Sequence, residues 1–273
     1  MKGVLLFAFN NERVDYVRLS LICGARANRL WDLPICVVSD VPKPARLPHG
    51  FVFWRQVDQP SKVNSKSYYD YGTALSFWNT NRHQALELTP FSETILMDTD
   101  LMINTTSIVD AWDGHGVKLS RTAYSADGVE FGTDIKFLSQ KTRLPMYWAT
   151  IVCFDHSPVA KEFFGWWLHV AEHYATYSHL FGFPSGPFRN DFAASVALEI
   201  MKGTSQSDFF DLPYAIPTLQ PGSKLTSLDP LTVSVIDQND DTDTNSSSFT
   251  LCTDAHVMNK KSILDCVKAK TNK

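Results

Sequence analysis

The sequence predicts an α/β protein in which a mostly parallel central sheet is flanked by helices and followed by a smaller, mixed C-terminal half. Apolar runs of strand length recur through the first hundred residues, and the segment after the first run carries apolar residues at helical spacing. The second half is less regular. Alternating strands and helices are typical of a parallel sheet with helices on both faces. A chain of 273 residues is long enough for one such domain, with or without a small subdomain.

The first half of the chain provides the expected sheet. The run GVLLFAF at 3–9 is uniformly apolar, which is typical of a strand buried on both faces. We expect strands at residues 3–9, 33–40, 51–57 and 93–103, the last of them central, and helical stretches at 14–30 and 65–88.

The second half has fewer clear signals. We expect a strand at 146–154, an aromatic helix at 160–178 and a further helix at 190–201. The polar run over 237–248 indicates a hairpin tip or a mobile lid. Neither a repeat nor a linker is evident, so we expect residues 1–273 to form a single domain.

Composition restricts the classes to which the protein can belong. No apolar run is long enough to cross a membrane, so no membrane partner is expected. Five scattered cysteines without a CxxC pair favour reduced thiols in a cytoplasm over a disulfide framework or a zinc site. The net charge of −4 argues weakly against nucleic acid, but residues 1–66 contain ten Lys or Arg against five acidic residues. A basic N-terminal face could therefore contact a polyanion.

The strongest chemical signal is a pair of carboxylates, Asp98 and Asp100, within the apolar run ILMDTDLMI. Burying an ionised carboxylate is costly unless it meets a cation or several donors. If the strand stays extended, both side chains point the same way, at the edge where open α/β sheets bind ligands. Two such oxygen ligands suit Mg²⁺ or Mn²⁺, with diphosphate oxygens completing the shell. The alternative is a strand end whose carboxylates bond loop amides, since DxD alone is a weak pattern.

A second signal is the segment DAHVMNKK near the C-terminus. His256 could add a nitrogen ligand to the same ion, which would favour Mn²⁺ somewhat, and a following lysine could offer an ammonium to a diphosphate. The alternative is a histidine on the surface of a terminal segment.

A third signal is GPFRNDFA, which places Asp191 in the first turn of the helix expected at 190–201. A carboxylate there suits the helix dipole, which is the structural alternative. As the candidate catalytic residue, Asp191 could accept the proton of an acceptor hydroxyl or orient a sugar. Arg189 could bind phosphate or pair with Asp191, and Asn190 is assigned with it to the acceptor side.

Two further pairs are weaker candidates. Tyr147 and Trp148 begin the strand expected at 146–154, where a ring could stack on a sugar or base of the acceptor, although plain core is an equal alternative. Lys66 and Arg82 flank a polar segment before the carboxylate strand. Either could reach a diphosphate, the alternative being ordinary surface charges.

The segments FAFNN, DTD, YWAT, FRNDFA and HVMNK occur in this order in a group of phage-encoded, glycosyltransferase-like proteins. The chain resembles that group over nearly its full length, and its layout is similar to that of glycogenin-like enzymes of the GT-A type. The resemblance implies a GT-A, Rossmann-like fold and a nucleoside-diphosphate sugar as donor, with a UDP-sugar favoured. It further implies Mn²⁺ or Mg²⁺ as cofactor and, for a phage protein, the host cytoplasm as location.

The resemblance also implies roles for parts of the chain. Residues 1–104 correspond to the nucleotide-sugar-binding half, and residues 105–273 to the acceptor-binding half with the C-terminal metal-ligand segment. Asp98, Asp100 and His256 correspond to the metal ligands. The residues expected to bind the donor are Phe9, Asn10, Asn11, Lys66, Arg82, Asp98, Thr99 and Lys260.

Four interpretations of function stay open. Large phages glycosylate hydroxymethylated cytosine in their own DNA, so the first is transfer to 5-hydroxymethylcytosine in double-stranded DNA. The second is transfer to a glycan, a protein or a small molecule. The third is a nucleotidyltransferase, although the segment after the first strand lacks the expected glycine-rich loop. The fourth is a non-enzymatic binding module, against which a DxD pair with a late histidine argues.

Overall fold

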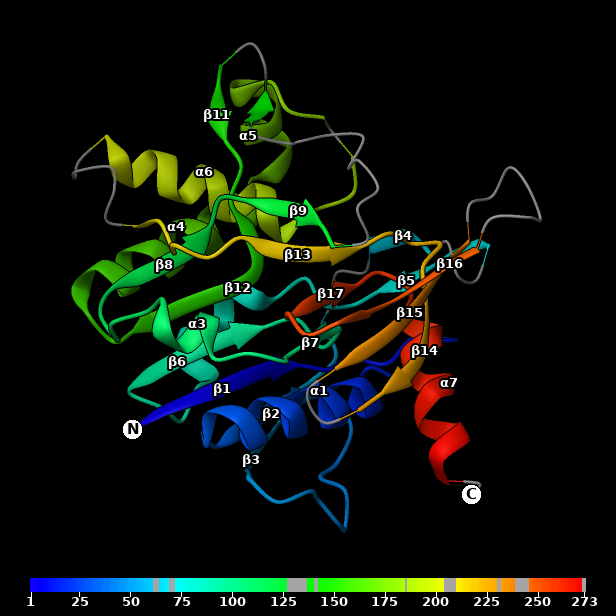
Figure 1. Ribbon diagram of the computed structural model, residues 1–273. Helices are drawn as coiled ribbons and strands as arrows, with labels where there is room; N and C mark the ends of the chain where they lie inside the picture. Colours follow the sequence, from blue (N-terminus) through cyan, green and yellow to red (C-terminus); the bar gives the residue numbers. More distant parts are fainter. Residues whose placement is uncertain are drawn as a thin grey trace.

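The computed structural model of the chain describes residues 1–60, 64–68, 72–126, 137–139, 142–184, 186–203, 210–229, 232–238 and 246–271. Its central sheet has six strands in the order β3-β2-β1-β6-β12-β8 (Figure 1). The four strands on one side run parallel to their neighbours, whereas β12 is antiparallel to both β6 and β8. The predicted mostly parallel sheet is therefore confirmed. The strands are β1 (Lys2–Phe7), β2 (Ile35–Ser39), β3 (Phe51–Gln56), β6 (Glu93–Met97), β8 (Val117–Ser120) and β12 (Trp148–Asp155).

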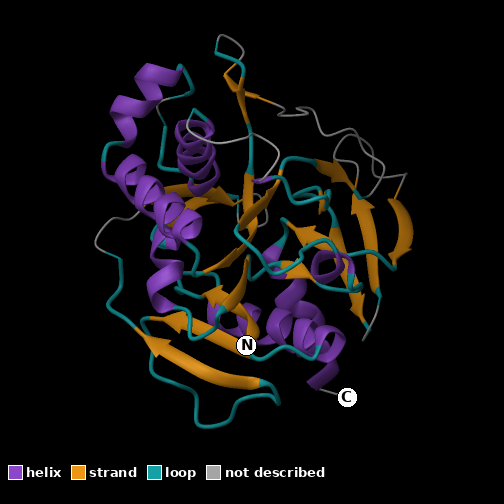
Figure 2. Ribbon diagram, turned by 90° about the vertical axis from the view of Figure 1, so that its left-hand side faces the viewer, coloured by secondary structure: helices purple, strands orange, loops and turns teal. Residues whose placement is uncertain are grey.

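Helices cover both faces of this sheet because its central strands are apolar on both sides. In β1, Val4 and Leu6 pack in the cluster that contains α1, whereas Leu5 and Phe7 pack with α4 and α6. The two helical layers lie on opposite sides of the sheet in Figures 1 and 2. The helices are α1 (Tyr16–Trp31), α2 (Ala85–Leu88), α3 (Ser107–Asp110), α4 (Pro158–Glu172), α5 (Tyr174–Phe181), α6 (Asn190–Lys202) and α7 (Lys260–Thr271), with a 3₁₀ turn η2 (Arg82–Gln84).

Local sequence explains where the long helices begin and end. Asp15 accepts a hydrogen bond from the amide of Arg18 at the start of α1, and Asp32 ends that helix in a left-handed conformation. Ser157 caps α4, and Pro158 occupies its first turn, where a missing amide hydrogen costs nothing. These signals agree with the helices expected from the sequence, except that the predicted helix at 160–178 divides at His173 into α4 and α5.

The remaining strands form smaller sheets beside the central one. A mixed sheet has the order β7-β17-β13-β9, an antiparallel sheet has the order β14-β15-β16, and two hairpins complete the set. The predicted mixed C-terminal half is thus present, although β8 and β12 from that half join the central sheet. These strands are β4 (Asn64–Tyr68), β5 (Thr73–Phe77), β7 (Leu101–Met102), β9 (Ala123–Ser125), β10 (Phe137–Ser139), β11 (Leu144–Pro145), β13 (Ile216–Leu219), β14 (Lys224–Leu228), β15 (Val233–Gln238), β16 (Ser246–Leu251) and β17 (Ala255–Val257).

Two predicted elements were wrong in part. The segment 65–88 was expected to contain helical stretches, and η2 and α2 provide them at its end, but β4 and β5 form an antiparallel hairpin before them. Threonine and aromatic residues in this segment have strand propensity, which outweighs the helical spacing. The strand expected at 93–103 ends at Met97, and a turn separates it from β7. The polar run at 237–248 joins β15 and β16, which pair as a hairpin, and its residues 239–245 lie outside the described part.

Within the described residues, no helix is long and apolar enough to cross a membrane. All five cysteines are free thiols, and four of them are buried.

Candidate metal centre

The two predicted carboxylates follow the last residue of β6, at the carboxyl end of a central strand. The amide of Asp98 donates to the carbonyl of Thr150 at 3.0 Å, and a turn then brings the amide of Leu101 to within 3.3 Å of the carbonyl of Asp98. The strand therefore does not stay extended as the sequence suggested. Asp98 and Asp100 converge because the chain turns between them, and not because they share a face of one strand.

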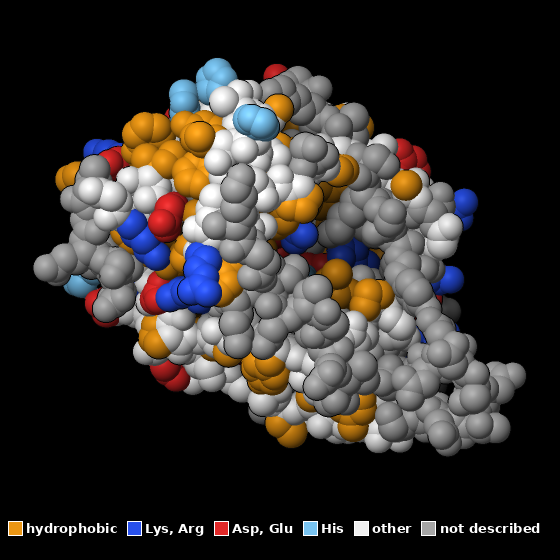
Figure 3. All heavy atoms as spheres, turned by 90° about the horizontal axis from the view of Figure 1, so that it is seen from above, with side chains coloured by type: hydrophobic (Ala, Val, Ile, Leu, Met, Phe, Trp, Pro, Cys, Tyr) orange, Lys and Arg blue, Asp and Glu red, His pale blue; other side chains and the backbone are white. Residues whose placement is uncertain are grey.

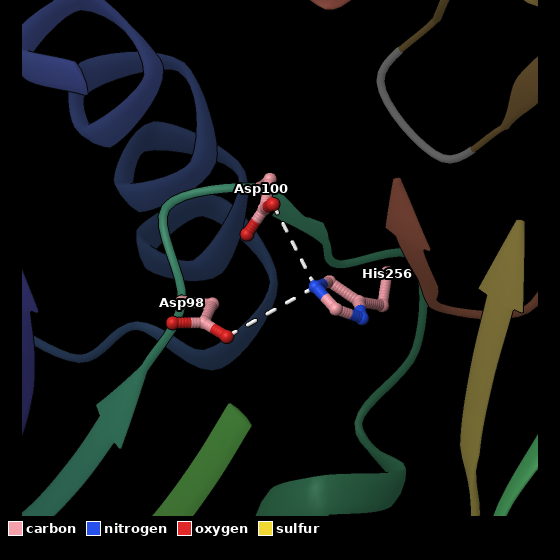
Figure 4. A group of neighbouring side chains, drawn as sticks. All are labelled: Asp98, Asp100 and His256. Atoms are coloured by element: carbon pink, nitrogen blue, oxygen red, sulfur yellow. Dashed lines mark ion pairs between the residues drawn. The ribbon is translucent and has the colours of Figure 1, made fainter. Parts of the chain in front are cut away.

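His256 reaches the same point from the other end of the chain. Its strand, β17, pairs with β7, so that His256 lies opposite Leu101. The Nε2 atom of His256 is 3.6 Å from Oδ2 of Asp100 and 3.9 Å from Oδ2 of Asp98 (Figure 4). The three ligand atoms lie within 4.8 Å of one another.

The distances from His256 to each carboxylate are compatible with one shared divalent ion. Ligand atoms about 2.1 Å from a shared ion can be no more than about 4.2 Å apart, and both distances from His256 meet that limit. Two carboxylates and one imidazole suit Mn²⁺, and also Mg²⁺ with added water. No other group of three or more His, Cys, Asp or Glu side chains with this proximity occurs among the described residues.

Each carboxylate also has a buried cationic partner. Nη1 of Arg82 is 3.0 Å from Oδ1 of Asp98, and Nζ of Lys260 is 2.5 Å from Oδ2 of Asp100. Burial raises the pKa of Asp98, and Arg82 acts in the opposite direction. For Asp100, burial also acts to raise the pKa, but Lys260 and His256 outweigh it and bring the pKa well below its ordinary value. Lys260 and His256 therefore favour the ionised form of Asp100, and Lys260 occupies the carboxylate oxygen that a cation would share.

Asp191 lies near Asp98 and is fixed by two hydrogen bonds. Its Oδ1 accepts a hydrogen bond from the amide of Ala149 at 2.8 Å, and its Oδ2 accepts one from Arg189 at 3.1 Å. Its negative charge is close enough to act on the carboxyl group of Asp98. Arg189 is about half-exposed and also lies over the ring of Phe192. The predicted pairing of Arg189 with Asp191 is thus present.

Three predicted donor-binding residues, Phe9, Asn10 and Asn11, lie in the loop after β1. Phe9 is buried in the core. Asn10 accepts a hydrogen bond from the amide of Val17, and Asn11 accepts bonds from the amides of Arg13 and Val14. These contacts shape the loop, and donor contacts by the three residues stay a prediction.

The predicted acceptor residues differ in exposure. Tyr147 is buried, and its hydroxyl donates to Asp211 at 2.6 Å, which favours a core role. Trp148 is partly buried at the start of β12. Asn190 is buried, and its amide donates to the carbonyl of Asn79 at 2.8 Å. Their acceptor roles stay predictions.

The last two donor candidates are less informative. Thr99 is buried in the turn between the two carboxylates. Lys66 belongs to β4, and its side chain lies outside the described part of the structure.

The surface near the middle of one face is hollowed. Seen from above, Lys or Arg and Asp or Glu atoms are visible on the floor of this hollow (Figure 3). A separate cleft of about 630 Å³ lies at the carboxyl ends of β2 and β3, with walls formed by Asp40, Gln56, Val57, Asp58 and Gln59. Both β2 and β3 run parallel to β6, so this cleft opens at the same edge of the sheet as Asp98.

Sequence reasoning missed two buried residues, Cys23 and Asp254, that bond the backbone of β7 and of the loop after it. The thiol of Cys23 donates to the carbonyl of Leu101 at 2.7 Å and thereby ties α1 to the turn. The carboxylate of Asp254 is buried and bonds the backbone after β7. Asp254 is part of the segment that drew attention to His256, but its backbone partners are about 150 residues away in the chain, and no local pattern reveals them.

No protein-family model matches the sequence, and no curated protein matches it. Among solved structures, the chain is similar to the galactosyltransferase LgtC, solved in complex with donor and acceptor sugar analogs. The TM-score is 0.44 at 12% sequence identity, and the similarity covers 72% of this chain and 70% of that chain. A similarity of this strength assigns no residue roles to this chain.

Proposed function

We propose that the protein is a metal-dependent glycosyltransferase of the GT-A type. It would move a sugar from a nucleoside-diphosphate sugar, with a UDP-sugar favoured, to a hydroxyl acceptor. The observation that carries this proposal is the convergence of Asp98, Asp100 and His256 at the carboxyl end of a central strand. Open α/β sheets bind ligands at this edge, and the ligand set suits a cation that also binds diphosphate.

The charges around the centre agree with an anionic leaving group. A divalent cation bound there would neutralise a departing nucleoside diphosphate. Arg82 and Lys260 bring two further positive charges to the carboxylates. Lys260 is at the first residue of α7, where helix amides add a partial positive charge. These groups would bind the diphosphate and stabilise the charge that develops on it during transfer.

Asp191 is the best candidate for the group that handles the acceptor or the sugar. It is partly exposed, is fixed by two hydrogen bonds and lies near the metal centre without being one of its three ligands. A carboxylate in that position would accept a proton from the attacking hydroxyl or bind a sugar hydroxyl.

The acceptor is a separate part of the proposal. We propose 5-hydroxymethylcytosine in double-stranded DNA, on the basis of the sequence resemblance and the excess of five positive charges in residues 1–66, ten basic minus five acidic. Binding that depends on phosphate contacts would weaken steeply with salt. The base would have to leave the stack to reach the centre. A glycan, protein or small-molecule acceptor is the alternative.

The test separates donor chemistry from acceptor choice. The protein is first incubated with Mn²⁺, a panel of nucleotide sugars and a mixture of the DNA, glycan and small-alcohol acceptors, and release of nucleoside diphosphate is measured, with His256→Gln as the matched control. Release by the wild type alone supports the transferase, and no release with any donor contradicts it. Acceptors are then compared as DNA with cytosine, 5-hydroxymethylcytosine or 5-hydroxymethyluracil, by nucleoside mass spectrometry. Transfer only to a glycan or small alcohol would exclude DNA and keep the transferase.

A further inference from the structure

His256 lies on a strand too short to fix its own position. β17 has three residues and pairs with β7 at only two positions and with β13 at two. A strand of this length depends on contacts at its ends. On the C-terminal side, Lys260 contacts Asp100. On the N-terminal side, the residue that precedes β17 is Asp254.

Asp254 is a buried carboxylate with four hydrogen-bond donors. Its Oδ1 accepts from the amides of Asn104 at 2.7 Å and Thr105 at 2.8 Å. Its Oδ2 accepts from the hydroxyls of Thr105 and Tyr214, both at 2.9 Å. The side chain is 1% exposed. Four donors offset the cost of burying the charge, and they fix both oxygens of the carboxylate.

The loop that supplies these donors is itself anchored to α1. Arg26 donates to the carbonyl of Ile103 at 3.1 Å and to the side chain of Asn104. Trp31 donates to the carbonyl of Thr105 at 2.8 Å. This loop directly follows β7, which begins one residue after Asp100. Side chains of α1 therefore hold this loop in place, next to the turn that contains Asp98 and Asp100. Asp254 connects β17 to the same loop.

We propose that Asp254 is a positioning residue that sets the distance between His256 and the two carboxylates, and so the affinity of the centre for a divalent cation. This inference rests on the proposed metal centre. Asp254 does not itself contact His256, Asp98 or Asp100 in any hydrogen bond or ion pair described for it. Its effect is transmitted through the backbone of one residue, Ala255. Loss of a partner that orients a metal ligand typically weakens metal affinity about 10–100-fold.

The variant Asp254→Asn tests this position with little change in volume. An amide has only one acceptor oxygen, so one pair of donors would face an NH₂ group. Asp155→Asn is the matched control, because Asp155 also accepts a backbone amide, that of Ser157, but lies at the far end of β12. Mn²⁺ affinity is measured without nucleotide by electron paramagnetic resonance. The nitrogen modulation from a coordinated imidazole is recorded in pulsed experiments, with His256→Gln as its reference.

We expect Asp254→Asn to bind Mn²⁺ about 10–100-fold more weakly and with reduced nitrogen modulation, and Asp155→Asn to match the wild type. Equal affinity and modulation in Asp254→Asn and wild type overturn the inference while the metal centre stands. Absence of Mn²⁺ binding in the wild type overturns the proposed function and the inference together. If Asp254→Asn does not fold, Tyr214→Phe removes one of the four donors and is expected to weaken Mn²⁺ binding in the same direction by less. Unchanged Mn²⁺ affinity in Tyr214→Phe would then overturn the inference.

Discussion

Asp98 and Asp191 are connected through the backbone of a single residue, Ala149. The amide of Ala149 donates to Asp191, and its carbonyl accepts from Arg82, which is paired with Asp98. A candidate metal ligand and the candidate catalytic carboxylate are thus fixed relative to each other by β12. Because the side chain of Arg82 is almost fully buried, water has little access to its hydrogen bond with Ala149 or to its ion pair with Asp98.

This linkage gives Asp191 a structural role as well as a chemical one, and two substitutions separate them. Asn at this position can still accept the amide of Ala149 but loses the charge, whereas Ala loses both. We expect Asp191→Asn and Asp191→Ala each to lower turnover by about 10²–10⁴-fold. Only Asp191→Ala should also lose about 1–3 kcal/mol of unfolding free energy, because it leaves the amide of Ala149 without its acceptor. Steady-state kinetics and chemical denaturation measure the two effects. Full turnover in Asp191→Asn would leave Asp191 with the structural role alone.

The elements with strong local signals were predictable from sequence, and the contacts between distant segments were not. The apolar run of β1 and the periodicity of α1 are local, and both elements are where they were expected. The break after Met97 was missed because ILMDTDLMI looks like one strand until β17 pairs with its second half. The sequence grouped Asp98, Asp100 and His256 through residue chemistry and the family resemblance, and the structure brings the three side chains together, while their role as metal ligands stays a prediction. Their buried counter-charges depend on long-range packing, and the pairing of Arg82 with Asp98 is visible only in the structure.

Removal of the metal should stop transfer. We expect EDTA to abolish it and added Mn²⁺ to restore it, and Asp98→Asn to abolish it irreversibly. Asp98→Asn also leaves the buried guanidinium of Arg82 without its ion pair, so its unfolding free energy has to be measured beside activity. His256→Gln is the cleaner control, because it removes a ligand and strands no buried charge. Full activity in chelator, with metal depletion verified by elemental analysis, would exclude the metal mechanism.

The thiols should differ sharply in reactivity. Cys252 is exposed, whereas the other four cysteines are buried. Burial raises the pKa of Cys36 to about 12 and that of Cys23 well above its ordinary value, so at pH 8 both stay protonated and unreactive. We expect a disulfide reagent to modify one thiol in the native protein and five in denaturant. Cys252→Ser should abolish the native reaction. Rapid modification of more than one native thiol would contradict the buried positions.

Lys260 serves as the counter-ion of Asp100 when no metal is bound. Both side chains are about 5% exposed. The Nζ atom of Lys260 contacts Oδ2 of Asp100, which is also the oxygen nearest to His256. Replacing Lys260 by Met leaves a buried carboxylate without its cation, which typically costs about 3–5 kcal/mol. A divalent cation would supply the missing charge. We therefore expect Lys260→Met to unfold at a lower temperature than wild type in EDTA, and Mn²⁺ to raise its unfolding temperature by more than it raises that of wild type. The same variant should bind Mn²⁺ alone at least as tightly as wild type, because the competing ammonium is gone, but should bind a nucleoside diphosphate more weakly.

Two measurements check these effects on Lys260→Met. Thermal unfolding with and without Mn²⁺ measures the stability effect, and calorimetric titration with the nucleotide measures the binding effect. Lys261→Met is the matched control on the exposed side of the same helix turn. Equal destabilisation of Lys260→Met with and without Mn²⁺ would show that Lys260 is a packing residue and not the counter-charge of the centre.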